Sequence, residues 1–329
     1  MRTDLCNILA CPDCRGALIL EISEQSDTEV LTGTLKCVAC RKCYSIKRGI
    51  PRFVTNESYV DSFSWQWNRF SRTQIDAFNG TQESEQRFRA ETGWQPEELK
   101  DELTLDAGCG AGRFSAIASQ WGARVVAVDL NEAVEACRSN MEELGQRVEV
   151  VQASLYALPF RPATFDRIFS LGVLQHTPDP QAAISALPVY LKPGGHLAFW
   201  IYEKRWTRFI MPRNYLRLLT RRLSPKANYA LSVLLVAIFF PLTLLLSLLP
   251  VLKKVLPLVP ISSRHYWGKL SLRQQWEWTM LDTFDSYSPV YESNQTEREV
   301  RDALASTGMS EVRRTAARGM AIVGRKAFN

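Results

Sequence analysis

Residues 105–112, Leu-Asp-Ala-Gly-Cys-Gly-Ala-Gly, combine the residue types that bind a nucleoside. An apolar segment ends at Asp106, and glycines follow at positions 108, 110 and 112. Glycine is required where the backbone turns sharply or a ligand lies against it, because a Cβ would clash there. A second apolar segment ends at Asp129, whose carboxylate is placed to accept hydrogen bonds from ribose hydroxyls. Together these two signals predict a site for a nucleoside-containing cofactor.

A second group of chemically active residues lies near the N-terminus, where six of the eight cysteines fall within the first 43 residues. Four of them form two Cys-x-x-Cys pairs, which are Cys11 with Cys14 and Cys37 with Cys40. Two such pairs complete a tetrahedral zinc site, and a full thiolate shell leaves no open position for catalysis. We therefore expect a structural zinc ion that stabilises a module too small for a large core. Cys43 is a competing ligand, and reduced cysteines without metal are the alternative.

The bulk properties limit the class of protein. The chain has 329 residues, of which 46% are hydrophobic and 22% charged, so we expect a globular protein with one large core and a small module. The net charge of +6 permits an anionic partner without requiring one. The first residues do not form the apolar run of a signal peptide, so we expect a cytoplasmic protein without disulfides.

The elements that position the nucleoside site alternate as in a doubly wound α/β sheet. We expect strands at 102–107, 124–129, 147–152, 165–171 and 196–202, with two final strands at 310–317 and 319–325. We expect helices at 112–121, 131–144, 180–191 and 295–307. Ligands bind beyond the carboxyl ends of such strands, which places Asp106, Asp129, Ser154 and residues 172–176 at one edge.

The glycine spacing separates two cofactor classes. A dinucleotide-binding loop has the pattern Gly-x-Gly-x-x-Gly, in which the third glycine lets the helix pack on the strand. Here Arg113 stands at that position, and the third glycine comes one residue earlier, at Gly112. S-adenosylmethionine has no pyrophosphate; it needs a close backbone and an acid for its ribose, which residues 106–112 and Asp129 supply. The alternative is some other nucleotide-binding sheet.

The run 106–112 resembles the first motif of class I S-adenosylmethionine-dependent methyltransferases. Further segments match that family in its order, at 158–160, 165–166, 171–176 and 191–195. The resemblance covers residues 100–202 and implies a Rossmann-like, seven-stranded sheet.

The resemblance also implies roles for individual residues. Asp106 and the backbone of Gly108, Gly110 and Gly112 are expected to hold the methionine part of the cofactor. Asp129 is expected to bind the ribose, with Leu130 beside the adenine and Ser154 and Leu155 at the adenine edge. Relatives often have an acid where this chain has Ser154. Gln175 and His176 are expected to face the sulfonium and the acceptor.

An acceptor that must lose a proton needs a base, and His176 is the first candidate because imidazole exchanges protons near neutral pH. The alternative is that His176 only orients a loop. Tyr202 and Glu203 are weaker candidates, and Asp285, Tyr287 and Tyr291 either border the acceptor site or pack as ordinary loop residues.

The cysteine-rich segment is similar to the zinc ribbon of the tRNA-methyltransferase activator family. The matching segments are 9–16, 35–40, 44–46 and 49–53, and the resemblance covers residues 5–55. Such ribbons are often fused or docked to methyltransferases.

Aromatic residues mark the segment that follows, at 59–94, and Phe63, Trp67 and Phe70 share one helical face. This segment is either a helix packed on the sheet or a cap over the cofactor, with an arginine such as Arg69 or Arg72 paired to the cofactor carboxylate. A third option is that nucleic acid stacks on its basic and aromatic residues.

Residues 227–252 carry no charge over 26 positions, and basic residues flank them. A single membrane crossing would separate the final strands from the sheet, and two crossings need about 40 residues. We expect Pro241 and Pro250 to break the stretch into shorter helices. The segment 227–261 then either dips into one leaflet as a peripheral membrane contact or forms a lid over a hydrophobic pocket; a dimer interface is the third option.

We therefore expect a zinc ribbon at 1–58, an aromatic helical linker or cap at 59–100, a methyltransferase domain at 101–203 and 284–329, and an apolar helical insertion at 204–283. The expected function is methyl transfer from S-adenosylmethionine to a small, hydrophobic or lipid-like acceptor, in the cytoplasm at the inner face of the membrane. The alternatives are methylation of tRNA or rRNA and a non-catalytic protein that binds S-adenosylmethionine or activates a partner.

Overall fold

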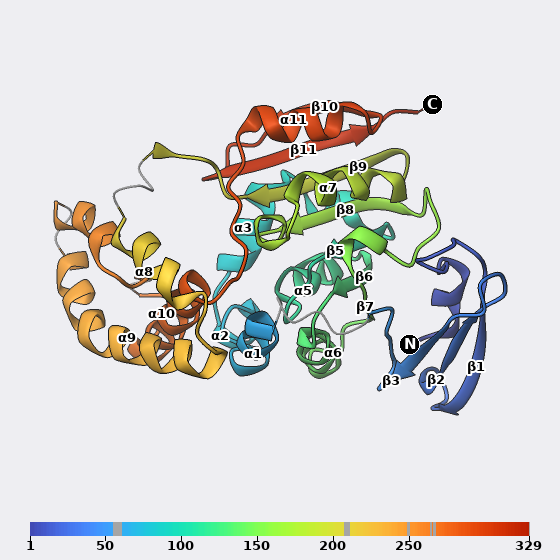
Figure 1. Ribbon diagram of the computed structural model, residues 1–329, viewed down its shortest axis with the longest axis horizontal. Helices are drawn as coiled ribbons and strands as arrows, with labels where there is room; N and C mark the ends of the chain where they lie inside the picture. The colour runs from blue at the N-terminus through green and yellow to red at the C-terminus, as the bar shows by residue number, and fades with distance from the viewer. Residues whose placement is uncertain (55–60, 207–210, 249–250, 264, 266–267, 329) are drawn as a thin grey trace.

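The computed structural model describes residues 1–54, 61–206, 211–248, 251–263, 265 and 268–328. The boundary expected between residues 58 and 59, and Tyr59 of the aromatic segment, lie outside them. Figure 1 shows the N-terminal sheet at one side of the molecule, the large sheet in the middle and the helices of residues 212–287 at the other side.

The large sheet has seven strands in the order β10-β11-β9-β8-β5-β6-β7. Its strands are β5 (Leu103–Ala107), β6 (Arg124–Asp129), β7 (Val148–Gln152), β8 (Phe165–Leu171), β9 (Leu191–Ile201), β10 (Met309–Arg314) and β11 (Met320–Lys326). The five strands β5 to β9 are parallel, and β11 runs antiparallel between β9 and β10. The expected seven-stranded, Rossmann-like sheet of class I methyltransferases is confirmed.

Helices cover both faces of this sheet (Figure 1). They are α1 (Asp61–Arg69), α2 (Asp76–Asn79), α3 (Glu83–Thr92), α4 (Pro96–Leu99), α5 (Arg113–Gln120), α6 (Ala133–Glu143), α7 (Pro180–Ala186) and α11 (Glu297–Ala305), with short 3₁₀ helices η3 (Leu155–Ala157), η4 (Leu174–His176) and η5 (Leu187–Tyr190). One core forms under α3, α5 and α6, and the other under α7 and α11. The helix expected over 180–191 tightens to a 3₁₀ turn at η5, which contains Pro188.

The N-terminal sheet consists of β1 (Leu18–Gln25), β2 (Val30–Cys37), β3 (Cys43–Lys47) and β4 (Ile50–Pro51), preceded by the 3₁₀ helix η1 (Thr3–Asn7). It joins the large sheet at the outer edge of β7, where the backbone N–H of Phe53 donates to Gln152 O at 2.8 Å. Leu9 bridges to Phe160, and both side chains are fully buried in the core that the two sheets share. The two sheets therefore share hydrophobic packing as well as hydrogen bonds.

The segment between β9 and α11 is helical, with α8 (Pro212–Thr220), α9 (Pro225–Leu248), the 3₁₀ helix η7 (Leu252–Leu258) and α10 (Leu272–Tyr287). The expectation that Pro241 breaks the apolar stretch is wrong, because α9 continues through it. A proline inside a helix costs about 3 kcal/mol, and packing of Val236 and Phe240 in one cluster with Met280 and Leu281 of α10 offsets that cost. Pro250 lies outside the described residues. The boundary expected between residues 283 and 284 falls inside α10.

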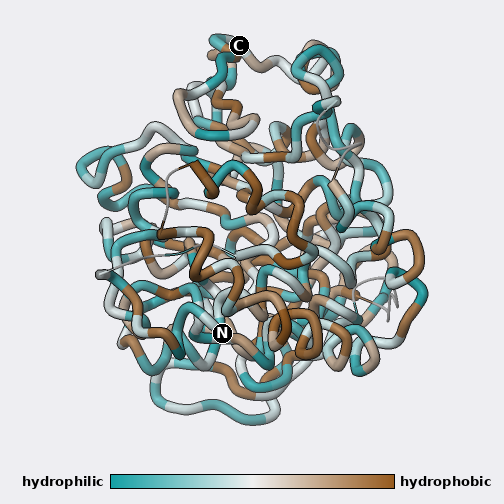
Figure 2. Tube along the Cα trace, turned by 90° about the vertical axis from the view of Figure 1, so that its left-hand side faces the viewer, coloured by the Kyte–Doolittle hydropathy of each residue, from teal (hydrophilic) through white to brown (hydrophobic). Residues whose placement is uncertain are grey.

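Helix α9 is long and apolar enough to cross a membrane by length and composition alone, and 28% of its most apolar stretch is buried. Figure 2 views the molecule from the side of these helices and shows hydrophobic segments across that face.

Candidate functional site

The loop after β5 has a backbone that only glycine adopts easily. Gly108, Gly110 and Gly112 have φ angles of +98°, +51° and +89°. A Cβ on Gly108 would collide with the side chain of Val173, and one on Gly110 would lie 3.1 Å from the ring of Trp67. The loop is therefore fixed by close approach of neighbouring segments as well as by its turn.

The carboxylate of Asp129, at the end of β6, holds this loop in place. The backbone N–H of Gly110 donates to Asp129 Oδ2 at 2.8 Å, and the side-chain amide of Asn131 donates to Oδ1 at 2.8 Å. Burial raises the pKa of Asp129, and these hydrogen bonds oppose that rise. Asp129 also lines a cleft of about 810 Å³, together with Leu130, Gly108 and Gly110.

Two expected cofactor residues lie behind the loop rather than in the cleft. Asp106 is 2% exposed, and its Oδ2 accepts a hydrogen bond from the Ser115 hydroxyl at 2.6 Å. Burial raises the pKa of Asp106 to about 7, although the Ser115 bond opposes the rise. A Cβ on Gly112 would lie 3.0 Å from Cys137 and Met141 of α6, so this glycine serves helix packing.

The other expected residues meet at the cleft, whose wall includes Ser154, Leu155, Gln175 and His176. Ser154 begins η3, and its hydroxyl oxygen accepts the backbone N–H of Tyr156 at 3.4 Å. The hydroxyl hydrogen of Ser154 is then left to donate to a ligand. The expected cofactor edge is thus assembled from β5, β6, η3 and η4.

His176 is fixed by contacts on three sides. Its Nδ1 lies 3.1 Å from the carbonyl oxygen of Tyr291, so we assign the proton to Nδ1, which leaves Nε2 as the basic atom. The rings of Phe63 and Tyr202 lie 5.1 and 5.6 Å from the imidazole. Glu203 is a weaker base than expected, because ion pairs led by Arg314 lower its pKa.

Helix α1 connects the two ends of the cleft. Trp67 packs against Gly110, and the Gln66 amide donates to Asp285 Oδ1 at 3.2 Å. The aromatic spacing identified this face of the helix, but no local signal marked Gln66. Arg69 and Arg72 contact Tyr229 and Glu143 instead of lining the cleft.

Several arginines that sequence reasoning did not assign to the site line the cleft, among them Arg87 and Arg113. Arg87 stacks over Trp200 with 4.9 Å between guanidinium and ring centre. Arg113 donates to Gln74 at 2.9 Å and to the Ser84 hydroxyl at 2.8 Å, which anchors α5 to the segment after α1.

Asp285, which was a candidate for the border of the acceptor site, lines the cleft as well. Burial raises the pKa of its carboxyl, and nearby His176 opposes that rise.

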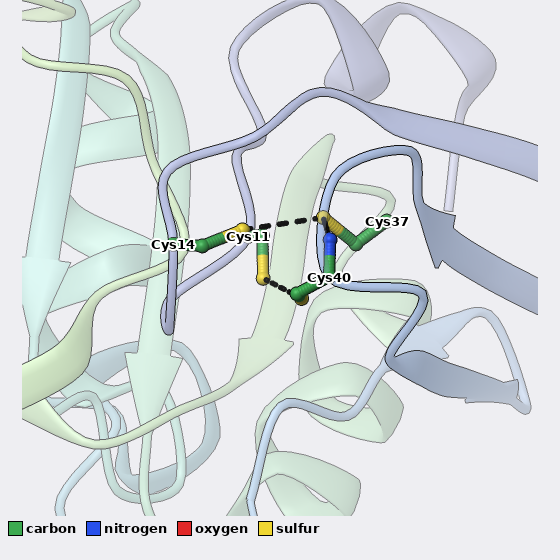
Figure 3. A group of neighbouring side chains, drawn as sticks. All are labelled: Cys11, Cys14, Cys37 and Cys40. Carbon is green, nitrogen blue, oxygen red and sulfur yellow. Dashed lines mark hydrogen bonds between the residues drawn. The ribbon is translucent and has the colours of Figure 1, made fainter.

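The four cysteines of the N-terminal sheet converge, as Figure 3 shows, with all four Sγ atoms within 4.8 Å of one another. The Sγ atoms of Cys11 and Cys40 lie 3.6 Å apart, and those of Cys14 and Cys37 lie 3.4 Å apart. Tetrahedral zinc–thiolate bonds would place sulfur atoms about 3.8 Å apart, so the cluster fits such an ion. The Cys40 backbone N–H is the main cause that lowers the pKa of Cys37 to about 6. Cys43 is exposed and outside this group.

A hydrogen-bonded connection links the ribbon to the cofactor edge. Arg52 donates to Gln152 Oε1 at 2.7 Å, and the amide of Gln152 donates to the Leu130 carbonyl at 3.1 Å. Arg52 also pairs with Glu135 of α6. The ribbon is therefore connected, through the side chain of Gln152, to the residue that directly follows Asp129.

Two family models match the chain. Residues 105–199 match the family described as a methyltransferase domain, and residues 2–49 match the family described as Trm112p-like protein. The expected resemblances of both segments are confirmed.

Curated relatives match the central part of the chain. One is the ubiquinone biosynthesis O-methyltransferase of Xylella fastidiosa (strain 9a5c), 41% identical over 101 residues, which are 30% of this chain and 41% of that protein. Another is the enzyme of the same name from Azotobacter vinelandii, 37% identical over 103 residues, 31% of this chain and 44% of that protein. The chain thus spans less than half the length of these relatives.

Solved structures with similar folds include magnesium protoporphyrin IX methyltransferase from Synechocystis PCC 6803, with a TM-score of 0.45 and 16% identity over 82% of this chain and 97% of that chain. The complex between the Haloferax volcanii Trm112 methyltransferase activator and a methyltransferase described as putative gives a TM-score of 0.45 and 12% identity over 81% and 98%.

Proposed function

We propose that this chain, in which a Trm112p-like segment precedes a class I methyltransferase fold, transfers a methyl group from S-adenosylmethionine to a small, hydrophobic or lipid-like acceptor. One observation carries the proposal. The glycine loop is hydrogen-bonded to Asp129 at one end of a cleft, and His176 lies in the wall of the same cleft.

The residues present fit this cofactor. When bound, S-adenosylmethionine supplies an electrophilic methyl group on its sulfonium. The backbone around Gly108 and Gly110 holds the methionine part. A side chain at either glycine would meet Val173 or Trp67. Asp129 accepts from the ribose hydroxyls, and Leu130, Ser154 and Leu155 border the adenine. Asp106 and Gly112 support the loop from behind.

His176 is the general base of the proposed reaction. Its Nε2 takes the proton that the acceptor oxygen or nitrogen loses as that atom is methylated. The Tyr291 carbonyl keeps the other ring nitrogen protonated, and Gln175 on the same turn lies beside the reacting groups. Positioning supplies much of the rate, because the leaving thioether is neutral.

The acceptor is proposed to be apolar because Leu256, Pro257 and Ile261 line the cleft. The names of the curated relatives, which refer to ubiquinone biosynthesis, agree with a lipid-like acceptor.

Contact with a membrane surface is the second part of this proposal. The inward face of helix α9 carries small polar residues beside Val236 and Phe240, with Asn228, Ser232 and Thr243 at 1%, 0% and 0% exposure, and five of its large aliphatic residues point outward. The outward stripe consists of Leu234, Ile238, Leu242, Leu245 and Leu248. A core helix of a water-soluble domain has the opposite pattern. Basic residues at both ends, such as Lys226 and Lys253, favour an anionic surface at the inner face of the membrane.

The remaining parts of the proposal concern organisation. Cys11, Cys14, Cys37 and Cys40 hold a structural zinc ion. The ribbon at 1–58 and the cap at 59–100 precede a methyltransferase domain at 101–203 and 284–329, and residues 204–283 form the insertion that carries the membrane face.

Methyl-labelled S-adenosylmethionine tests the proposal. Purified protein is incubated with it and, separately, with a lipid extract, a small-metabolite extract and total RNA. We expect label in the organic-soluble, low-mass fraction. Asp129→Ala should abolish this labelling together with cofactor binding, whereas His176→Gln should abolish labelling and leave cofactor binding within about twofold. Label in RNA would make the protein an RNA methyltransferase, and cofactor binding without any labelled product would make it non-catalytic.

A further inference from the structure

A positively charged side chain lies in the cleft wall far along the chain from the cofactor loop. Arg213, the second residue of α8, lines the same cleft as His176 and is half-buried. Its neighbours in the wall, Leu256, Pro257 and Ile261, are apolar. A guanidinium in such surroundings requires a counter-charge or a set of good hydrogen-bond acceptors.

Among the residues that the structure describes, Arg213 makes its hydrogen bonds with neutral groups. Its Nη1 donates to Ser262 Oγ at 3.2 Å, and its Nη2 lies 3.4 Å from the sulfur of Met211, which is a weak acceptor. Within the described ranges, no carboxylate lies at ion-pair distance from it. An arginine has five N–H donors, so this guanidinium keeps donors for a ligand in the cleft.

The serine beside Arg213 adds to the same surface. Ser286 donates its hydroxyl hydrogen to the Asp282 carbonyl at 2.8 Å, so in the 2.7 Å contact between the two serines Ser262 is the donor. The Ser262 oxygen then accepts the hydrogen bond from Arg213 and so orients the guanidinium. Helix α8 begins here without a side-chain cap, and its dipole increases the positive potential.

Three acids of the cleft, Asp282, Asp285 and Glu292, are held by other partners. Asp282 accepts from Gln74, Asp285 accepts from Gln66, and Glu292 pairs with Arg217 at 3.3 Å. None of these contacts neutralises Arg213.

We propose that Arg213 is an anion-binding residue of the acceptor site, so that the acceptor is an amphiphile carrying a carboxylate or phosphate group. The anion pairs with the guanidinium, and the apolar body lies against Leu256, Pro257 and Ile261. Lys253, in the same cleft wall, adds a second positive charge. This inference rests on the proposed function, whose acceptor it specifies.

Binding of simple amphiphiles tests the inference without any methyl transfer. The full chain is titrated by calorimetry, below the critical micelle concentration, with dodecyl phosphate, dodecanoate and dodecanol. Both anions should bind about tenfold or more tightly than the alcohol, since a charged hydrogen bond is lost with the alcohol. Arg213→Gln should bring the anions close to the alcohol and leave the affinity for the alcohol unchanged. Preference for only one anion would identify which of the two groups the acceptor carries.

Matched variants distinguish the loss of a charge in the cleft from the loss of a positive charge elsewhere on the surface. Arg221→Gln removes the same charge from an exposed position outside the cleft, and Lys254→Gln does so beside Lys253. Lys253→Gln should weaken anion binding, whereas these two controls should not. If Arg213→Gln fails to fold by circular dichroism, the two lysine variants decide the question.

Equal affinity of the wild type for the alcohol and the anions would overturn the inference, as would equal effects of a site variant and its control. Because no turnover is measured, such a result leaves methyl transfer standing. Conversely, anion binding that depends on Arg213 remains even if no labelled product forms.

Discussion

Arg52, which follows the last strand of the ribbon, donates a 2.7 Å hydrogen bond to the side chain of Gln152 on the edge strand of the large sheet. Gln152 in turn holds the Leu130 carbonyl, next to the proposed ribose ligand. The described residues of the ribbon do not line the cleft, yet they connect through Gln152 to the backbone of the proposed cofactor edge.

Arg52→Ala should weaken binding of S-adenosylhomocysteine by about three- to tenfold, because one charge-assisted hydrogen bond that orders this edge is lost. Isothermal titration calorimetry measures the effect. Arg48→Ala is the control, since Arg48 shares Glu135 with Arg52 but makes no bond to Gln152. Equal losses in both variants would show that Glu135, and not Gln152, transmits the effect.

The cysteine cluster should contain one zinc ion per chain, measured by mass spectrometry of the metal. Cys14→Ser should reduce the zinc content and lower the melting temperature by about 5 °C or more, because the ribbon contributes buried residues to the common core. Cys43→Ser should retain both the metal and the stability, and a loss of zinc in that variant would mean that the ligand set is assigned incorrectly.

Gly108→Ala should abolish cofactor binding, because its φ of +98° is unfavourable for alanine and the added Cβ collides with Val173. Gly145→Ala is the control that distinguishes backbone strain from a steric clash. Gly145 also has a positive φ, +63°, but a Cβ added there would meet no atom within 4 Å. That control should cost about 1 kcal/mol of stability and leave cofactor affinity unchanged. Cofactor binding by Gly108→Ala would contradict the placement of the methionine part.

The buried carboxyl of Asp106 predicts a pH dependence of stability. Burial raises its pKa to about 7 from the ordinary value of 3.8. Below pH about 4 the group is protonated in the folded and the unfolded chain; between pH about 4 and 7 the unfolded chain ionises first, so stability falls as the pH rises. Asp106→Asn cannot ionise at this position. The melting temperature of the variant minus that of the wild type should therefore be higher at pH 8 than at pH 5. Asp27→Asn, at an exposed turn, should follow the wild-type curve at a constant offset. Parallel curves for Asp106→Asn and wild type would refute the prediction.

Leu245→Glu should reduce binding to vesicles of equal parts phosphatidylglycerol and phosphatidylcholine by about tenfold or more, because a charge enters the apolar stripe of α9. Co-sedimentation measures binding. Ile19→Glu, on the ribbon, is a matched control because Ile19 is 55% exposed and Leu245 is 63% exposed. Similar losses in both variants, or no binding by the wild type, would remove the membrane proposal.

The elements of the site that follow from local sequence were predictable. A positive-φ loop needs glycine, a strand that ends in an acid places that acid at the sheet edge, and Cys-x-x-Cys pairs form their own metal-binding turns; each of these patterns is complete within a few residues. This is why the sequence could predict that Gly108 and Asp129 lie together at one edge of the sheet and that the four cysteines converge.

What could not be predicted depends on contacts between distant segments. Gln66 and Asp285 are 219 positions apart, and no local pattern predicts the hydrogen bond between them. The hydrogen bond that the Ser115 hydroxyl of α5 donates to Asp106, behind the loop, is another contact that the local sequence does not contain. The effect of Pro241 depended on how firmly α9 packs against α10, which the local sequence does not contain.

Helix α1 has a kinetic consequence. It contacts the glycine loop through Trp67, His176 through Phe63 and Asp285 through Gln66, so one short helix forms part of the wall at both ends of the cleft. Displacement of α1 would unseat the spent cofactor and the methylated product together. Departure of the two products is then expected to be a linked event, because the same helix borders both of their proposed binding regions.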